Sequence, residues 1–237
     1  MLIDLHAHSS GISTCCKADG AAILAAARSA QIDGLCLCNH YYTGYMKERN
    51  ETPTAFAQSF LDEYNAVKAL ADAADIRLYF GIEVSPELYH RVHLLVYGVE
   101  PDFVLRHPEM YDYTQEQLYN VVHENGGFLV QAHPMRRGRN VLLDPRFLDG
   151  VEISSHLLYD GTHYDELAAF AKQNGLFLTS GGDYHADTPR AKCGVYLPEH
   201  LSTVREIVQY LQEAPQIELC AQEAVEAPPE IKIFEKN

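Results

Sequence analysis

Short apolar runs alternate with longer segments of mixed polarity along most of the chain, beginning at the second residue. Continuous apolar runs of strand length predict buried strands at 2–6, 34–38, 76–84, 91–97, 128–132, 150–154 and 176–180. The intervening segments are rich in Ala and Leu, or repeat apolar residues near the 3.6-residue period of a helix. They predict helices at about 20–31, 54–74, 114–125, 163–174 and 201–213.

The residues that flank these segments support the predicted helix ends. Asp19 precedes the first helix as an N-cap, while Gly126-Gly127 and Gly175 follow two others. Residues 9–17 and the polar, aromatic segment 41–52 predict loops, and the chain becomes irregular, acidic and Pro-containing from about 222. We therefore expect one domain at 1–221 and a C-terminal tail at 222–237.

Strands that alternate with helices and are apolar throughout predict a largely parallel sheet of the α/β class. Seven such strands in one domain favour a closed, TIM-like barrel over an open sheet. In barrels of this kind the side chains that carry out chemistry lie at the carboxyl ends of the strands. Functional residues are therefore expected where the predicted strands end.

Potential metal ligands occupy these strand ends. The first strand ends in His6-Ala7-His8, and side chains two residues apart on a strand point the same way, about 6.6 Å apart. Four later apolar runs also end in His, Asp or Glu, while His93 lies nearer the middle of its strand. Together the candidate ligands are His6, His8, His40, Glu83, His93, His133, Asp183 and His185.

This mixture of imidazoles and carboxylates is typical of sites for Zn, Mn or Fe ions. The set exceeds what one ion needs, so we expect two to three divalent ions with at least one bridging carboxylate. Closely spaced ions lower the pKa of water and offset charge in phosphoryl transfer, so no serine or cysteine nucleophile is required. Each residue alone has an ordinary structural explanation, such as a helix N-cap for Asp183. Their recurrence at successive strand ends favours the metal site.

Positive charge follows two of these motifs. Arg136, Arg137 and Arg139 lie just after the strand that ends at His133, and Arg190 lies beyond the last motif. The planar fork of arginine donates paired hydrogen bonds to phosphate. These arginines are candidate substrate-binding residues, with Arg136 first by proximity. The alternative is a solvated basic loop paired with the acidic surface.

Composition and charge limit the classes of partner and the cell compartment that are expected. The formal net charge of −15 repels nucleic acid in general, and no apolar run approaches the length of a membrane span, about 20 residues. No basic region followed by an apolar segment opens the chain, so we expect no signal peptide. Without one, the six cysteines are expected to be reduced and the chain cytoplasmic.

The ordered motifs resemble those of the PHP (polymerase and histidinol phosphatase) family over residues 2 to about 200: Asp4-Leu5-His6-Ala7-His8, Asn39-His40, Gly81-Ile82-Glu83, Ala132-His133-Pro134 and Gly182-Asp183-Tyr184-His185. The resemblance implies a distorted seven-stranded β/α barrel with up to three metal ions. It also implies that His6, His8, Glu83 and Asp183 surround one ion. Glu83 would bridge to a second ion held by His93 and His133, and His40 and His185 would hold a third.

Two departures from the family pattern concern the third ion. The family usually has Asp-His where this chain has Asn39-His40, so hydrogen bonding or charge near His40 must differ. Some members supply a further histidine from the loop after the first motif, and residues 9–16 contain none here. The third site is then weak, empty, or completed by Cys15 or Cys16, and a thiolate would favour zinc. The alternative is an unreactive, partly buried cysteine pair.

The sequence therefore predicts a metal-dependent phosphoesterase that hydrolyses a phosphomonoester of a small metabolite, resembling histidinol phosphate or a nucleotide. Glu83, Asp183, His185 and Arg136 are the residues expected to act in catalysis. A non-catalytic metal- or ligand-binding module is one alternative, because Asn39 replaces an acid. A metal-dependent amidohydrolase is another, although no clear lysine lies at a strand end to bridge two ions.

Overall fold

Strand β1 (Leu2–Ala7) is buried along its whole length in the computed structural model, which describes residues 1–89, 91–138 and 141–236. It pairs in parallel with β2 (Gly34–Leu37), which pairs in parallel with β4 (Arg77–Val84). A second parallel group consists of β6 (Phe128–Gln131), β7 (Gly150–Ser154) and β8 (Phe177–Gly181). Continuous burial of these strands accounts for their unbroken apolar runs.

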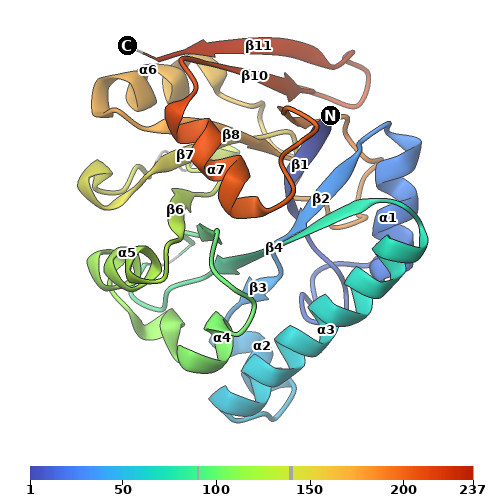
Figure 1. Ribbon diagram of the computed structural model, residues 1–237, viewed down its shortest axis with the longest axis vertical. Coiled ribbons are helices and arrows are strands. Elements are labelled where there is room, and N and C mark those ends of the chain that lie inside the picture. The colour runs from blue at the N-terminus through green and yellow to red at the C-terminus, as the bar shows by residue number, and fades with distance from the viewer. Residues whose placement is uncertain (90, 139–140, 237) are drawn as a thin grey trace.

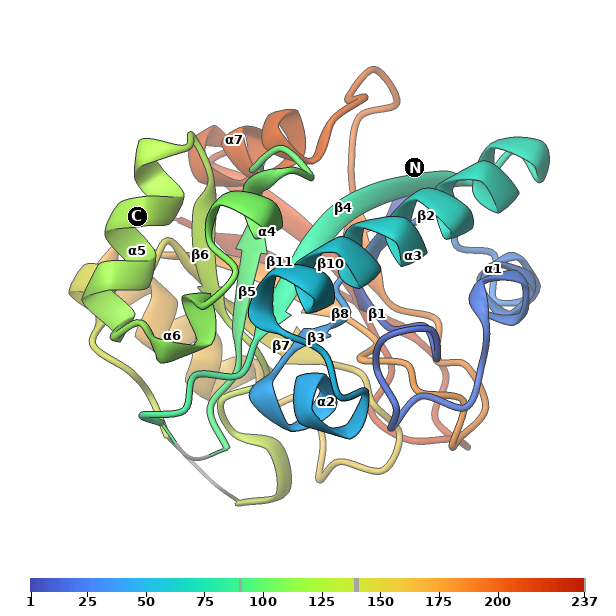
Figure 2. The same ribbon diagram turned by 90° about the horizontal axis from the view of Figure 1, so that it is seen from below.

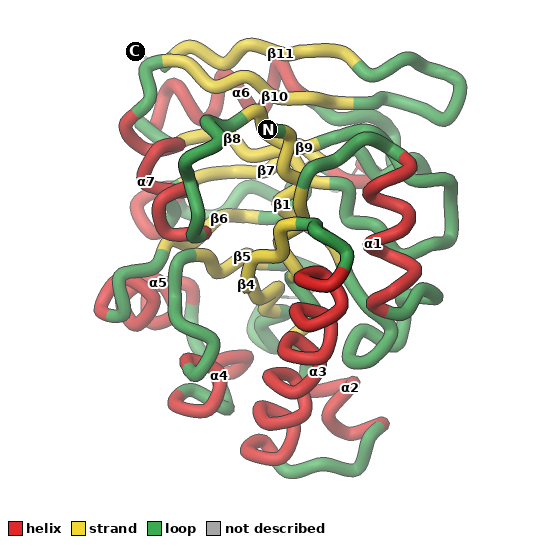
Figure 3. The backbone as a smooth tube through the Cα atoms, turned by 45° about the vertical axis from the view of Figure 1, so that its right-hand side comes forward, coloured by secondary structure: helices red, strands yellow, loops and turns green. Residues whose placement is uncertain are grey.

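The two ends of this sheet approach each other. A bridge joins Ala7 to Tyr184, and the backbone N–H of Asp183 donates to the carbonyl of His6 at 2.9 Å. The sheet follows the order β1-β2-β4-β5-β6-β7-β8. Figure 3 shows β5, β6, β7 and β8 one above another. The chain is thus a nearly closed α/β barrel, which confirms the predicted fold class.

Strand β5 (Leu94–Tyr97) runs opposite to both of its neighbours. The prediction of a largely parallel sheet is wrong here, because a buried apolar run looks the same in either direction. The predicted strand 91–97 is also too long, and His93 precedes β5 instead of lying within it. Reversal brings the start of β5 to the same end of the barrel as the end of β4.

Helices surround the strands, as Figure 2 shows for α3, α4, α5 and α6. The predicted helices appear as α1 (Gly20–Ser29), α3 (Pro53–Ala73), α5 (Gln115–Glu124), α6 (Tyr164–Asn174) and α7 (Val204–Glu213). Asp19 caps α1 by accepting from the N–H of Ala22 at 2.8 Å, and Gly175 ends α6 in the left-handed region at φ +68°. No helix among the described residues is long and apolar enough to cross a membrane.

The segment expected to be a loop at 41–52 is partly ordered structure. It contains β3 (His40–Tyr41), which pairs with the end of β4, and the short helix α2 (Thr43–Glu48). Tyr41 is fully buried and packs among aromatic side chains, so this part of the segment belongs to the core. Four short elements of the described residues are predicted neither as helix nor as strand. They are α4 (Phe103–Arg106) and the single-turn 3-10 helices at Met110–Asp112, Arg136–Gly138 and Pro145–Phe147.

The last part of the chain extends the sheet beyond β1. Strands β9 (Gly194–Tyr196), β10 (Gln216–Ala221) and β11 (Glu230–Glu235) form an antiparallel extension, seen at the top of Figure 1 for β10 and β11. The sequence predicts an irregular tail from about 222, whereas 230–235 is a strand. Side chains on this strand alternate between the two faces of the sheet, so Phe234 is buried while Ile231 and Ile233 are exposed. The strand therefore lacks the unbroken apolar run by which the other strands were predicted.

Candidate metal centre

The structure brings all eight candidate ligands to one end of the barrel. His6 and His8 lie at the end of β1, Glu83 in β4 and His133 after β6. The ligand atoms fall into three overlapping groups, and within each group they lie within 4.8 Å of one another. The groups are His6, Glu83, His133 and Asp183; His40, Glu83 and His93; and His8, His40 and His185.

Glu83 is the centre of this arrangement. Its Oε1 lies 2.7 Å from His93 Nδ1 and 3.1 Å from His133 Nε2, while its Oε2 lies 2.6 Å from His40 Nδ1 and 3.4 Å from His8 Nε2. Burial would raise the pKa of Glu83, but the imidazoles of His40 and His93 hold that pKa well below its usual range. The carboxylate therefore has ligand partners on both oxygens, as a bridging ligand requires.

Two buried atoms around Glu83 lack a hydrogen-bond partner. Nδ1 of His40 and Oε2 of Glu83 face each other, yet neither makes a hydrogen bond. Leaving a buried polar atom unpaired costs about 1–3 kcal/mol. A cation between them would satisfy both, so the donor set fits the metal ions that the sequence predicts.

Asp183 forms the opposite side of the cluster. Its Oδ1 lies 3.0 Å from His8 Nε2, its Oδ2 accepts a hydrogen bond from the Tyr159 hydroxyl, and its pKa stays well below the usual range because imidazoles outweigh burial. Its φ is +46°, and that of His133 is +29°. Non-glycine residues in this region are strained, and such strain concentrates at functional sites.

His6 and His8 point their Nε2 atoms at each other at 3.0 Å. Two neutral imidazoles can share only one proton between such atoms, and Asp183 Oδ1 lies within 3.5 Å of both. The Nε2 lone pairs of the two imidazoles and the Asp183 carboxylate thus face one another with too few protons to pair them all by hydrogen bonds. That convergence is typical of cation ligands.

Two side chains that the sequence analysis did not assign orient these imidazoles. Both oxygens of Glu152, in β7, lie 3.0 Å from Nδ1 of His6, and the Ser13 hydroxyl lies 3.2 Å from Nδ1 of His8. When Nδ1 donates to such a partner, Nε2 is left free to bind metal. Burial raises the pKa of Glu152 to about 7, against the opposing effect of His6. The sequence feature that could have identified Glu152 is a single glutamate inside an apolar strand, because a fully buried glutamate is almost always paired.

Asn39 holds the loop that supplies Ser13. Its Oδ1 accepts from the Ser9 N–H at 2.8 Å and from the Ser13 hydroxyl at 3.0 Å, and its Nδ2 donates to the Ser9 hydroxyl at 2.9 Å. Ser9 in turn donates to Glu63 at 2.6 Å. An aspartate at this position has no N–H to donate to Ser9. The amide therefore suits this network in a way that an acid does not.

The two adjacent cysteines have different surroundings. Cys15 is exposed and lines the cavity above the ligands together with His40 and His185. Burial would raise its pKa, but hydrogen-bonding interactions with His185 and His40 lower the pKa of Cys15 to about 6. Cys16 is buried, faces the carbonyls of His8 and Ala18, and has its pKa raised to about 11 chiefly by burial.

The arginines do not form one cluster. Arg136 reaches the centre, with Nη1 2.9 Å from the Tyr159 hydroxyl and 3.9 Å from Asp183 Oδ2, and Arg137 lies over the Tyr159 ring. Arg139 lies outside the described residues. Arg190 is buried, pairs with Asp4 and lies over Tyr184. Of the described arginines, Arg136 and Arg137 line the cavity and Arg190 does not.

A cavity of about 320 Å³ opens over the ligands. It joins an adjacent cavity of about 260 Å³ through shared residues, namely His40, Tyr45, His93 and Arg136. His156 lines the first and Tyr42 the second, whereas Tyr41 is in the core. A further cavity, of about 620 Å³, lies elsewhere and is lined by none of the candidate ligands.

Comparisons with known proteins give matches among solved structures. No protein-family model and no curated protein matches the sequence. A two-domain protein from Bacteroides vulgatus containing a predicted PHP-like metal-dependent phosphoesterase is similar with a TM-score of 0.69 at 13% identity. The match covers 94% of this chain and 65% of that one, so this chain spans just under two thirds of that protein.

Two further structures are similar over most of both chains. A protein from Bifidobacterium adolescentis, provisionally described as a metal-dependent phosphoesterase, has a TM-score of 0.55 at 14% identity. The match covers 87% of this chain and 94% of that protein's chain. An amidohydrolase from Chromobacterium violaceum, with bound sulfate and no metal, has a TM-score of 0.53 at 18% identity and covers 88% and 96%. At these identities the likeness concerns the fold, and the chain has the PHP-type barrel fold that its motifs predicted.

Proposed function

We propose that this chain is a metal-dependent phosphoesterase that hydrolyses a phosphomonoester of a small metabolite. The observation that carries the proposal is the position of Glu83, a buried carboxylate with imidazoles on both oxygens and a positive side chain, Arg136, at the same cavity. Carboxylate-bridged cations next to an arginine suit a doubly charged phosphate group.

The family resemblance suggests how the ligands would be shared. His6, His8, Glu83 and Asp183 would hold one ion, Glu83, His93 and His133 a second, and His40 and His185 a third. The structure groups the ligand atoms somewhat differently, with His133 beside His6, Glu83 and Asp183, and His8 beside His40 and His185. When bound, such ions activate water and offset the negative charge that develops in phosphoryl transfer. The chain contributes orientation, because Glu152 and Ser13 fix the ring nitrogens that face away from the ions.

Arg136 and Arg137 bind the phosphate in this proposal. The Arg136 guanidinium is only 16% exposed and is held by Tyr159, so its charge points into the cavity with little water around it. A guanidinium with little water around it forms stronger charged hydrogen bonds than one in bulk solvent. Arg139, next along the loop, remains a candidate from the sequence. Arg190 is less suited, since its charge is already opposed by Asp4.

The substrate is small because the two connected cavities are small. Their volumes, about 320 and 260 Å³, suit a phosphate and a compact leaving group. Tyr42, Tyr45 and Tyr89 line the second cavity, which favours a leaving group with a planar or apolar part. Both histidinol phosphate and nucleoside monophosphates have such a part.

Amide hydrolysis is the second candidate, because one of the similar structures is an amidohydrolase. The bridging group distinguishes the two readings. In this chain the group between the imidazoles is a carboxylate, and no lysine lines either of the two connected cavities among the described residues. Phosphoester hydrolysis therefore remains the function that the site supports best.

The test uses the full chain, stripped of metal and reloaded with Zn, Mn or Fe(II). Hydrolysis of p-nitrophenyl phosphate, histidinol phosphate, nucleoside monophosphates and simple amides is compared. We expect phosphomonoester turnover that requires metal and is lost in Glu83→Gln, whereas Glu124→Gln, an exposed change on α5, keeps it. Turnover of amides alone, or no metal binding and no turnover under any condition, would refute the proposal.

A further inference from the structure

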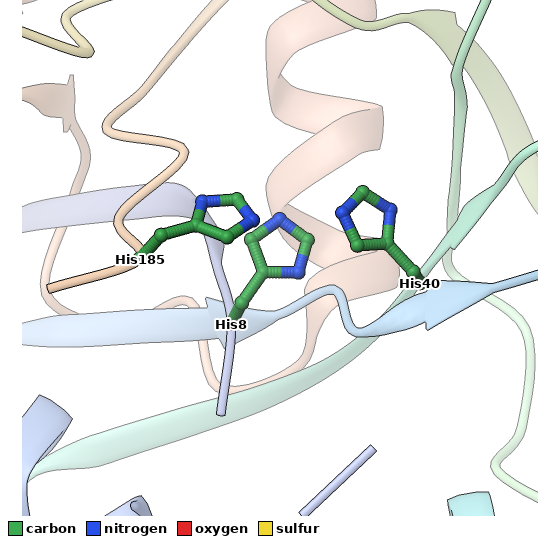
Figure 4. Close-up of side chains that lie close together, drawn as sticks. All are labelled: His8, His40 and His185. Carbon is green, nitrogen blue, oxygen red and sulfur yellow. The ribbon is translucent and has the colours of Figure 1, made fainter. Parts of the chain in front are cut away.

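The loop between β7 and α6, residues 155–163, forms part of the wall of the cavity over the candidate ligands. Its Tyr159 lines that cavity together with His185, one of the three imidazoles that Figure 4 shows. The Tyr159 hydroxyl donates to Oδ2 of Asp183 and accepts from Nη1 of Arg136 at 2.9 Å. The position of this loop therefore helps to fix the direction of the Arg136 guanidinium.

Contacts within the loop make it a compact turn. The ring of His156 stacks on that of Tyr159, with the centroids 4.4 Å apart and the planes at 15°. Nδ1 of His156 accepts from the N–H of Leu158 at 3.2 Å, and Oδ1 of Asp160 accepts from the N–H of Arg137 at 2.6 Å. The turn thus joins the tyrosine ring to the backbone of the basic loop.

The connection between β10 and β11 holds both ends of this turn. The N–H of Gln222 donates to the Ser155 hydroxyl at 3.0 Å. Glu223 accepts twice from Thr162, through Oε2 from the backbone N–H at 2.8 Å and through Oε1 from the hydroxyl at 2.5 Å. Hydrogen bonds to an ionised acceptor are about twice as strong as neutral ones, and Thr162 is buried, so little water competes for it.

Two local features support the contact between Glu223 and Thr162. Gly161 has φ +109°, and a Cβ there would lie 3.1 Å from Oε2 of Glu223, so glycine suits both the backbone and the close approach. The side-chain amide of Gln222 donates to the carbonyl of Ala227 at 3.0 Å, within the same connection. The carboxylate is therefore presented from an ordered segment.

We propose that Glu223 is a positioning residue, which holds the loop 155–163 so that Arg136 stays directed into the cavity for the substrate phosphate. Glu223 is not among the described residues that line the two connected cavities, so it acts through the loop. Apparent affinity falls with the fraction of molecules in the binding-competent arrangement, and this contact keeps that fraction high. The inference rests on the proposed function, to which the phosphate role of Arg136 belongs.

The test compares Glu223→Ala with Glu223→Gln in the full chain, loaded in turn with Zn, Mn and Fe(II). A glutamine can accept from the N–H of Thr162 and donate to its hydroxyl, so it keeps both hydrogen bonds while removing the charge. Glu226→Ala, an exposed change in the same connection, is the control. Circular dichroism checks that each variant is folded.

Three measurements are made on these variants. Steady-state kinetics with p-nitrophenyl phosphate give KM and kcat, and calorimetry gives the Kd of inorganic phosphate. Hydrogen exchange of the metal-free chain reports the protection of the loop 155–163.

We expect Glu223→Ala to exchange faster in the loop and to raise KM and the phosphate Kd about tenfold, as for a competent fraction of about one tenth, with kcat changed much less. Glu223→Gln should keep most of the parent affinity. In the background of Arg136→Ala the effect of Glu223→Ala should nearly vanish, because the group that it positions is gone. If Glu223→Ala does not fold, Thr162→Val removes one of the two hydrogen bonds and should raise KM by a smaller factor.

The inference is overturned by KM and phosphate Kd values that stay at those of the parent, even with faster exchange, because the contact is then purely structural. Equal losses in Glu223→Gln, or effects that add fully to those of Arg136→Ala, also overturn it. Phosphate affinity that depends on Glu223 in a chain without phosphomonoester turnover refutes only the proposed function. Turnover that is unaltered in Glu223→Ala refutes only this inference.

Discussion

Both carboxylate oxygens of Glu152 lie 3.0 Å from Nδ1 of His6, and the opposite nitrogen of that ring faces Glu83 and Asp183 at 3.5 Å. The pair spans the barrel from β7 to β1, although 146 residues separate the two in sequence. Glu152 thus selects the ring nitrogen that is available to an ion without touching the ion itself.

Glu152→Gln should therefore weaken metal binding without removing a ligand. The glutamine amide offers one acceptor oxygen where the carboxylate offers two, and the N–H of His133 also uses Glu152 at 3.2 Å. We expect metal affinity to fall about 10- to 100-fold. Competition with a chromogenic zinc chelator measures this change. Glu166→Gln, an exposed change on α6, is the control, and an affinity equal to that of the parent chain would contradict an orienting role.

Asn39→Asp should lower the free energy of unfolding by about 1–3 kcal/mol. The introduced carboxylate cannot donate to the Ser9 hydroxyl, whose own proton already goes to Glu63. Chemical denaturation of the metal-free chain measures the loss.

A second substitution tests this explanation of Asn39. In the double variant with Glu63→Gln, Ser9 can donate to the introduced carboxylate and accept from the glutamine amide, so part of the stability should return. Strict additivity of the two single effects would show that the Ser9 network does not explain the asparagine.

Arg136→Ala should raise KM for phosphomonoesters by at least about tenfold. A charged hydrogen bond contributes about 1.5–3 kcal/mol, and each 1.4 kcal/mol is a factor of ten. Steady-state kinetics on the metal-loaded chain give KM and kcat separately. Arg146→Ala is the control, because that side chain is 77% exposed and pairs only with Asp144 among the described residues. An unchanged KM would shift the phosphate role to Arg137 or Arg139.

Arg190→Met should act on stability more than on substrate binding. It leaves the buried Asp4 carboxylate without its counter-ion, which typically costs about 3–5 kcal/mol. Adding Asp4→Asn removes the charge but keeps an acceptor for the N–H groups of His6 and Gly182, so the double variant should regain much of the loss.

Thermal and chemical unfolding of the two Arg190 variants test this expectation. A raised KM in Arg190→Met with unchanged unfolding would instead favour the phosphate-binding role expected from the sequence.

The apolar pattern predicts the barrel strands because burial on both faces leaves an unbroken hydrophobic run. The same pattern carries no information about direction, and this is why the reversal of β5 and the true position of His93 were missed. Segment 41–52 is predicted as a loop because it is polar and aromatic, whereas Tyr41 is part of the core. The β10–β11 hairpin was missed because only Phe234 of its last strand is buried.

The candidate ligands other than His93 could be predicted from the sequence because they lie at or just after the ends of apolar runs. Their partners across the barrel could not, because a hydrogen bond such as that between Glu152 and His6 depends on the closure of the sheet. The sequence ranks Arg136 first by its proximity to His133, but it could not show that Arg190 pairs with Asp4, because that contact also depends on packing. Local spacing predicts which residues share an end of the barrel, and packing decides which of them touch.

The reversed strand β5 has a consequence for how this barrel can change. Since β4 and β5 are antiparallel neighbours, the connection between them turns back at the mouth of the site, and its described residues, 85–89 and 91–93, contain no helix. Pro86, Tyr89 and Arg91 of that connection line the second cavity. Insertions or substitutions there would reshape the wall of the second cavity, while Glu83 stays anchored by the ladder between β4 and β5. Under the proposed function, substrate preference can therefore change at this one loop while the carboxylate at the centre of the ligand cluster keeps its place.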